Sequence, residues 1–110
     1  MKWIEIENMS QVDQLFESSL STKQLIFKHS TRCSISSMAL RRAEEQLPIP
    51  NLTSHYLDLI QFRNVSDYIS EKSGVVHQSP QVIVINNNNV VYHGSHGSID
   101  WQEIKKLCIE

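Results

Sequence analysis

Cys33 is the residue of this chain whose type and position best suit chemistry. It follows the apolar run 24–29 and stands where a helical pattern begins. Free backbone N–H groups and the helix dipole stabilise an anion at such a place, and the thiolate is the form of cysteine that attacks disulfides. The charge of Arg32 and the hydroxyl of Ser36 stand close by in the sequence. We therefore expect Cys33 to form and release mixed disulfides, the alternative being an inert cysteine at a helix start.

The elements that must position Cys33 alternate between strand patterns and helix patterns. Apolar residues recur every three or four positions in the helical segments and run together in the strands. Glycine, proline and asparagine mark the ends of these segments. The expected elements are an edge strand at 3–6, a helix at 10–20 opened by a Ser10–Asp13 capping box, a strand at 24–29, a helix at 33–47, a strand at 52–57, a helix at 62–73, a hairpin of 81–85 and 90–93, and a helix capped by Ser98 that runs to about 109.

A proline lies at the start of the strand expected beside that of Cys33. Ser79 and Pro80 precede this strand, where a proline is tolerated. The order of a strand, a cysteine at a helix start, a parallel strand, a helix, a proline-led strand, a hairpin and a helix is the layout of the thioredoxin-like fold. We therefore expect an α/β protein with a central mixed sheet flanked by helices on both faces. In this layout the proline faces Cys33, and the Ser79–Pro80 bond is cis.

Composition limits the class of protein further. The 110 residues are 40% hydrophobic, which suits one domain over 1–110. Ten Lys and Arg against 12 Asp and Glu give a net charge of −2, which argues against binding to nucleic acid. The longest aliphatic run is 82–85, whereas a bilayer span needs about 20 apolar residues, so we expect no membrane insertion. The start of the chain has no apolar signal region, from which we expect a cytoplasmic location.

Three separate motifs carry a resemblance to a known family. They are FKHSTRCSIS at 27–36, HQSPQ at 77–81 and YHGSH at 92–96. Together they resemble the YtxJ-type bacillithiol-system proteins, the monothiol bacilliredoxins. The resemblance covers essentially the full chain in order, from Trp3 to the closing helix, and the three motifs agree in spacing. A single Cys-x-x-Ser would be far less specific.

The resemblance assigns roles to residues one by one. It implies a catalytic role for Cys33. The residues it implies for substrate binding are Thr31, Arg32, Ser36, Ser79 and Pro80, with Gln81 completing the Ser-Pro-Gln part of the second motif. The chain departs from the expected pattern at Ser34, where proline is expected, and at Gly94, where alanine is expected. Neither departure removes a reactive group.

The function implied by the resemblance is that of a thiol–disulfide oxidoreductase. Such an enzyme removes bacillithiol from S-bacillithiolated client proteins of the cytosol. Cys33 would take the bacillithiol and be freed by a second thiol, because Ser36 occupies the position of a resolving cysteine. Bacillithiol is then a co-substrate, and no bound cofactor is expected.

Two other functions remain open from the sequence. The chain could be a thioredoxin-fold binding module in which Cys33 is unreactive. It could also be a monothiol iron–sulfur carrier that shares a cluster between the cysteines of two copies. Titration of the Cys33 thiol distinguishes the binding module from the enzyme. A colourless pure protein would count against the iron–sulfur carrier.

Histidines and basic residues near the motifs are further candidates for contact with the thiol. His93 and His96 flank Gly94 in the segment that leaves the hairpin, where they could bind the acidic groups of bacillithiol or simply be solvated. His29 at the strand end is a weaker candidate. Lys28 and Arg32 are the cations expected to meet an anionic thiol.

The second cysteine is expected to be structural. Cys108 shares a helix face with apolar residues, and in the thioredoxin layout it lies at the far end of the last helix, out of reach of Cys33. The histidines and cysteines of the chain fit no metal-binding spacing, so we expect no metal site.

Overall fold

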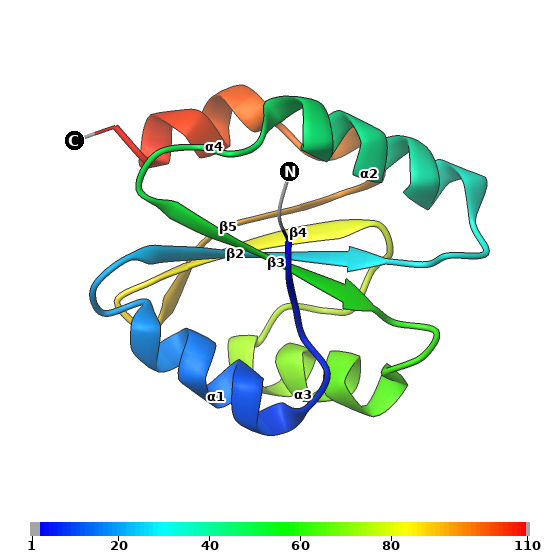
Figure 1. Ribbon diagram of the computed structural model, residues 1–110, viewed down its shortest axis with the longest axis horizontal. Helices are drawn as coiled ribbons and strands as arrows, with labels where there is room; N and C mark the ends of the chain where they lie inside the picture. Colours follow the sequence, from blue (N-terminus) through cyan, green and yellow to red (C-terminus); the bar gives the residue numbers. More distant parts are fainter. Residues whose placement is uncertain (1–2, 110) are drawn as a thin grey trace.

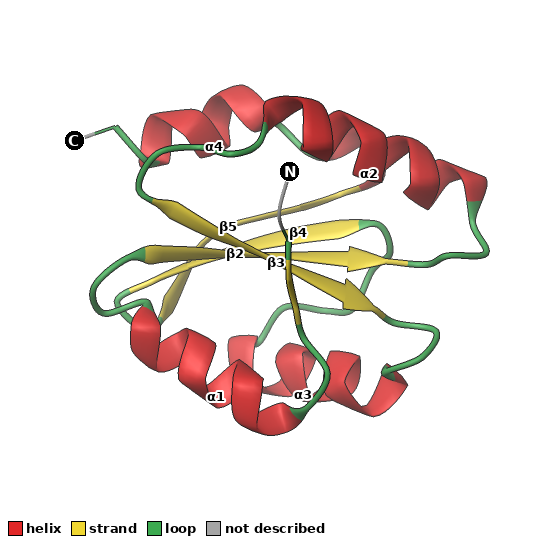
Figure 2. Ribbon diagram, in the orientation of Figure 1, coloured by secondary structure: helices red, strands yellow, loops and turns green. Residues whose placement is uncertain are grey.

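The computed structural model describes residues 3–109 and has three layers. A twisted five-stranded sheet forms the middle layer, with α2 (Ser34–Gln46) and α4 (Trp101–Leu107) on one face and α1 (Met9–Ser18) and α3 (Arg63–Ser73) on the other (Figures 1 and 2). This is the expected mixed sheet with helices on both faces. None of the helices within residues 3–109 is long and apolar enough to span a bilayer.

The sheet places the strand that leads to Cys33 at its centre. Its strands lie in the order β1-β3-β2-β4-β5. Both β1 and β2 pair with β3 in parallel, whereas β4 pairs antiparallel with both β2 and β5. The strand bounds are β1 Ile4–Glu5, β2 Lys23–His29, β3 Leu52–Asp58, β4 Gln81–Asn86 and β5 Asn89–Ser95. Because β2 is covered on both faces, six of its seven residues are buried, although only Leu25, Ile26 and Phe27 among them are apolar.

Alternation along β2 divides the core into two parts. Leu25 and Phe27 belong to the apolar cluster under α2 and α4, and Ile26 belongs to the cluster over α1 and α3. Successive side chains of a strand point to opposite faces, so both helix layers are anchored on the same strand. Phe27 is fully buried and lies two residues before the end of β2, the strand that leads to Cys33.

Two helix starts differ from the sequence prediction. Asn8, not Ser10, is the N-cap of α1, and its side chain accepts a hydrogen bond from the backbone N–H of Gln11 at 2.9 Å. Asp100, not Ser98, caps α4 through the N–H groups that follow it. Ser98 lies instead in a short 3₁₀ turn, η1 (His96–Ser98). Asparagine and aspartate cap the free N–H groups of a helix as well as serine does. Asn8 and Asp100 can therefore take the role that the sequence prediction gave to Ser10 and Ser98.

The hairpin and the proline-led strand follow the sequence prediction. Asn87 and Asn88 have φ values of 51° and 67° in the turn between β4 and β5, a region that asparagine tolerates. The Ser79–Pro80 bond is cis, as predicted. A second cis bond, Leu47–Pro48, was not foreseen, because nothing in the local sequence separates it from an ordinary trans proline.

Candidate functional site

Cys33 is half-exposed and is the N-cap residue of α2. Its backbone N–H donates to Ser30 O at 3.2 Å, and its carbonyl accepts from Ser37 N–H at 3.0 Å. The thiol makes no capping hydrogen bond to the start of α2, and the first turn of that helix carries no carboxylate. The first N–H groups of α2 are therefore available to a thiolate, and no negative charge within that turn opposes it.

Ser36 does not point where the sequence analysis placed it. The side chain is fully buried. Its Oγ lies 2.7 Å from Nδ1 of His29 and accepts a hydrogen bond from Ser30 N–H at 3.0 Å. The expectation that the Ser36 hydroxyl contacts substrate or donates to the thiolate is corrected. One turn into α2, this residue faces the end of the sheet rather than the solvent.

His29 is also an interior residue rather than a surface ligand. Its ring stacks on Phe27 at 6.2 Å between centroids and lies 5.8 Å from the ring of Tyr56. Burial lowers the pKa of His29, although the nearby Asp58 carboxylate acts in the opposite direction. The imidazole is therefore neutral near pH 7 and holds the Ser36 hydroxyl.

The proline loop lies at the same edge of the sheet as Cys33. Strand β4 begins opposite the end of β2, with Gln81 paired to Lys28. The residues that follow β2 and those that precede β4 therefore meet at one edge, as Figure 1 shows at the end of the sheet where α2 begins. Pro80 is buried, and the Ser79 hydroxyl is buried with no hydrogen-bond partner among the described residues. This hydroxyl is a spare donor and acceptor within the loop.

His96 lies directly on this loop. Its backbone N–H donates to Pro80 O at 3.1 Å, and its ring Nε2 is 3.1 Å from Ser79 O. The residue is exposed and has a φ of 53°. With Ala39 and Arg42 of α2 it also borders a small pocket, so η1 bridges the proline loop and the helix that carries Cys33.

His93 does not belong to this group. It lies within β5, not in a loop, and pairs with Ile83 of β4. Residues directly opposite each other on paired strands share a face of the sheet, and Ile83 faces the α1 and α3 layer. Since α2 covers the other face, the expectation that His93 meets the thiol is wrong.

Lys28 is likewise turned away from the site. The side chain is fully buried, and its Nζ lies 3.1 Å from Ser66 O, 3.3 Å from Ser70 Oγ and 3.2 Å from Nδ1 of His77. Alternation along β2 points it at α3, the opposite face from α2. Lys28 cannot meet an anionic thiol, which leaves the exposed Arg32 as the cation beside Cys33.

The buried Lys28 predicts an unusual pH dependence of stability. Burial lowers its pKa from 10.5 to about 8. Between these two pH values the unfolded chain binds a proton that the folded chain does not, so stability rises as pH increases. We expect the unfolding free energy of the native chain to gain up to about 3 kcal/mol, relative to Lys28→Met, between about pH 8 and 10.5. Urea unfolding of both proteins at the two pH values measures this, and an unchanged difference would contradict it.

Cys108 is buried, as predicted, and lies far from Cys33. It follows α4 and lines a pocket with Pro48 and Ile49, beyond the C-terminal end of α2. The 13 residues of α2 span about 20 Å, and Cys33 stands at the other end of that helix. Figure 1 shows the same separation between the start of α2 and the end of α4. Burial also raises the pKa of the Cys108 thiol.

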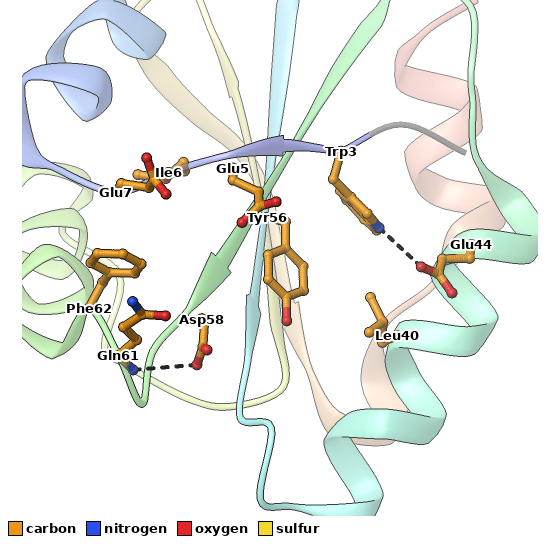
Figure 3. A pocket seen from close by; sticks show the side chains of 10 residues that line it. All are labelled: Trp3, Glu5, Ile6, Glu7, Leu40, Glu44, Tyr56, Asp58, Gln61 and Phe62. Carbon is orange, nitrogen blue, oxygen red and sulfur yellow. Dashed lines mark hydrogen bonds between the residues drawn. The ribbon is translucent and has the colours of Figure 1, made fainter.

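A cleft that no sequence motif predicted lies beside α2, where Leu40 and Glu44 of that helix line it. Its volume is about 440 Å³, and Figure 3 shows its walls. They come from β1, β3, α2 and the turn after β3, so no local sequence pattern marks the cleft. Its lining residues are Trp3, Glu5, Ile6, Glu7, Leu40, Glu44, Tyr56, Asp58, Gln61 and Phe62.

The cleft is negatively charged. Four carboxylates line it, and one of them, Glu44, accepts a hydrogen bond from the Trp3 indole N–H at 3.3 Å. Burial and the surrounding carboxylates raise the pKa of the Tyr56 phenol. The cleft itself therefore disfavours anionic ligands.

Residues 3–109 contain no cluster of three or more histidine, cysteine or acidic side chains placed to hold a metal ion.

Comparison with known families identifies the chain. The family model of the monothiol bacilliredoxin BrxC matches residues 4–104. This chain belongs to the monothiol bacilliredoxin family. The match spans every element from β1 to the middle of α4, including the Cys33 turn and the proline loop.

Solved structures similar to this bacilliredoxin show the same fold. One, described as an oxidoreductase with a thioredoxin fold, is 30% identical, with a TM-score of 0.82 over 94% of this chain and 90% of the other. Thioredoxins from Halobacterium salinarum and Malassezia sympodialis are 13% and 12% identical, both with TM-scores of 0.73 over 97% of this chain and 88% of theirs. The bacilliredoxin thus has the thioredoxin fold, and its family supports a role in thiol redox chemistry.

Proposed function

We propose that this bacilliredoxin removes bacillithiol from mixed disulfides on cytoplasmic proteins, using Cys33 as its nucleophile. The observation that carries the proposal is the placement of a half-exposed cysteine at the N-cap of α2, beside a cis-proline loop, with the second cysteine buried beyond the other end of that helix. One accessible thiol suits the exchange of a single bound thiol.

The proposed reaction is a thiol–disulfide exchange. The Cys33 thiolate attacks the bacillithiol sulfur of the mixed disulfide, the bond between bacillithiol and the client cysteine breaks, and the client leaves as a thiolate. A second thiol, such as free bacillithiol, then attacks the bacillithiol sulfur of the adduct, forms a disulfide with it, and restores the Cys33 thiolate. Electrons balance within each exchange, so the proposal requires no bound cofactor.

The surroundings of Cys33 suggest where bacillithiol lies. Thr31 and Arg32 are exposed in the turn before the cysteine, and Arg32 offers a positive charge to the acidic groups of the thiol. The Ser79–Pro80 loop lies at the same end of the sheet, and His96 contacts its backbone at Ser79 O and Pro80 O. We propose that bacillithiol binds between these two segments, away from the acidic cleft.

The proposal predicts a single, stable adduct. Treatment of the reduced protein with oxidised bacillithiol should add one bacillithiol, located on Cys33, which persists until free thiol is supplied. The distance between the two cysteines forbids internal resolution, because a disulfide requires Cα atoms within about 7 Å. Intact-protein and peptide mass spectrometry measure the adduct and its site.

A matched variant serves as the control. Cys108→Ala should carry the same adduct with the same lifetime. Failure of the native protein to form any adduct would support an unreactive binding module instead. Spontaneous loss of the adduct with formation of a Cys33–Cys108 disulfide would show that Cys108 resolves the reaction and that the proposal of a one-cysteine cycle is wrong.

A further inference from the structure

The pair formed by His29 and Ser36 spans the turn that carries Cys33. His29 is the last residue of β2, and Ser36 lies in the first turn of α2. Their side chains meet at 2.7 Å between Nδ1 and Oγ, although seven positions separate them in the sequence. This contact joins the end of the strand to the start of the helix, with the cysteine in between.

The hydrogen bonds of the turn connect this pair to Cys33 through the backbone. Ser36 Oγ accepts from Ser30 N–H at 3.0 Å, and Ser30 O accepts from Cys33 N–H at 3.2 Å. A hydroxyl has one proton and two acceptor sites, so Ser36 can satisfy both Ser30 and His29 at once. The position of the Cys33 backbone therefore depends on where the Ser36 hydroxyl is held.

The surroundings keep His29 fixed. Only 4% of its surface is exposed, and its ring lies against those of Phe27 and Tyr56. Buried hydrogen bonds without access to water hold their geometry more tightly than exposed ones. A rigid imidazole at the strand end can thus hold a buried hydroxyl in one orientation.

We propose that His29 is a positioning residue which, through Ser36, holds Cys33 at the N-cap of α2 and so maintains the reactivity of its thiolate. Ser36 then has a function beyond replacing a resolving cysteine: it is the link between the strand and the cysteine turn. The proposal deepens the proposed function, on which its biological meaning rests, but it concerns the reactivity of Cys33 toward any electrophile.

The test measures the alkylation of Cys33 in the full chain by iodoacetamide at pH 7, with peptide mass spectrometry to separate Cys33 from Cys108. His29→Phe keeps an aromatic ring in the stack but removes Nδ1, and Ser36→Ala removes the hydroxyl. Each should react about threefold to tenfold more slowly than the native protein, the effect of losing one hydrogen bond that aligns the thiolate. The double variant should be no slower than the slower single variant, because the two residues act as one unit.

His29→Asn is the rescuing variant. Its side-chain amide can occupy the place of Nδ1 and bond to Ser36, so it should react within about twofold of the native protein. If the role of His29 were purely structural, the melting temperature of all three single variants would fall. Alkylation would then not be slow in His29→Phe and near-native in His29→Asn. Thermal melts confirm that each variant is folded, and if His29→Asn does not fold, the double variant decides.

Two results would overturn the proposal: native alkylation rates in both His29→Phe and Ser36→Ala, or additive losses in the double variant. Because iodoacetamide replaces bacillithiol, these results are independent of the proposed function. If the variants show the expected slower alkylation but the native protein forms no adduct with bacillithiol, bacillithiol is not the substrate, and the positioning role of His29 and Ser36 still holds.

Discussion

Cys33→Ser should abolish the removal of bacillithiol from a bacillithiolated test protein. The rate is expected to fall by at least about a hundredfold, to that of the exchange with free thiol alone, because a hydroxyl cannot replace the thiolate as nucleophile or leaving group. Mass spectrometry of the client over time, with bacillithiol as the second thiol, measures the loss of its adduct.

The second cysteine provides the matched control for this experiment. Cys108→Ala should keep the rate within about twofold of the native protein, since Cys108 is buried beyond the far end of α2. Equal losses in both variants would contradict the one-cysteine mechanism. Activity retained by Cys33→Ser would place the chemistry at another residue.

Phe27→Ala should be among the most destabilising single substitutions in the chain. Phe27 is fully buried and stacks on Trp3 at 5.8 Å between ring centroids as well as on His29. Removal of a buried phenyl ring costs about 3–5 kcal/mol, a large part of the 5–15 kcal/mol by which small domains are stable. The midpoint of chemical denaturation should fall accordingly, with a largely unchanged slope.

An exposed apolar residue of the same sheet provides the comparison. Val91 lies on the edge strand β5 with 40% of its surface exposed, and Val91→Ala should cost no more than about 1 kcal/mol. If the two variants lost similar stability, the apolar cluster that contains Phe27, under α2 and α4, would not be a main support of the fold.

The cleft beside α2 and the turn that carries Cys33 have opposite charges. Carboxylates line the cleft, whereas Arg32 precedes the cysteine. Tyr56 lines the cleft, and its ring lies 5.8 Å from that of the buried His29. This arrangement supports the proposal that bacillithiol binds to Cys33 on the side of the proline loop and not on the side of the cleft.

The sequence by itself determined the elements and the place of the cysteine. Helix and strand periodicities and the asparagine turn are local signals, so they revealed the order of the elements and the start of α2 at Cys33. The cis bond before Pro80 was expected from the thioredoxin-like layout as a whole and not from a local signal. The matched motifs also identified the family. The helix caps were less certain, because several neighbouring residues can fill the same role.

Only the tertiary structure decided which side chains reach the site. The direction of Lys28, Ser36 and His93 depends on strand alternation, on the register between β2, β4 and β5, and on how α2 is set against the sheet. These are contacts between residues far apart in the chain, and a local pattern carries no record of them. For the same reason the acidic cleft, assembled from three separate segments, and the pairing of His29 with Ser36 emerged only when the chain was folded.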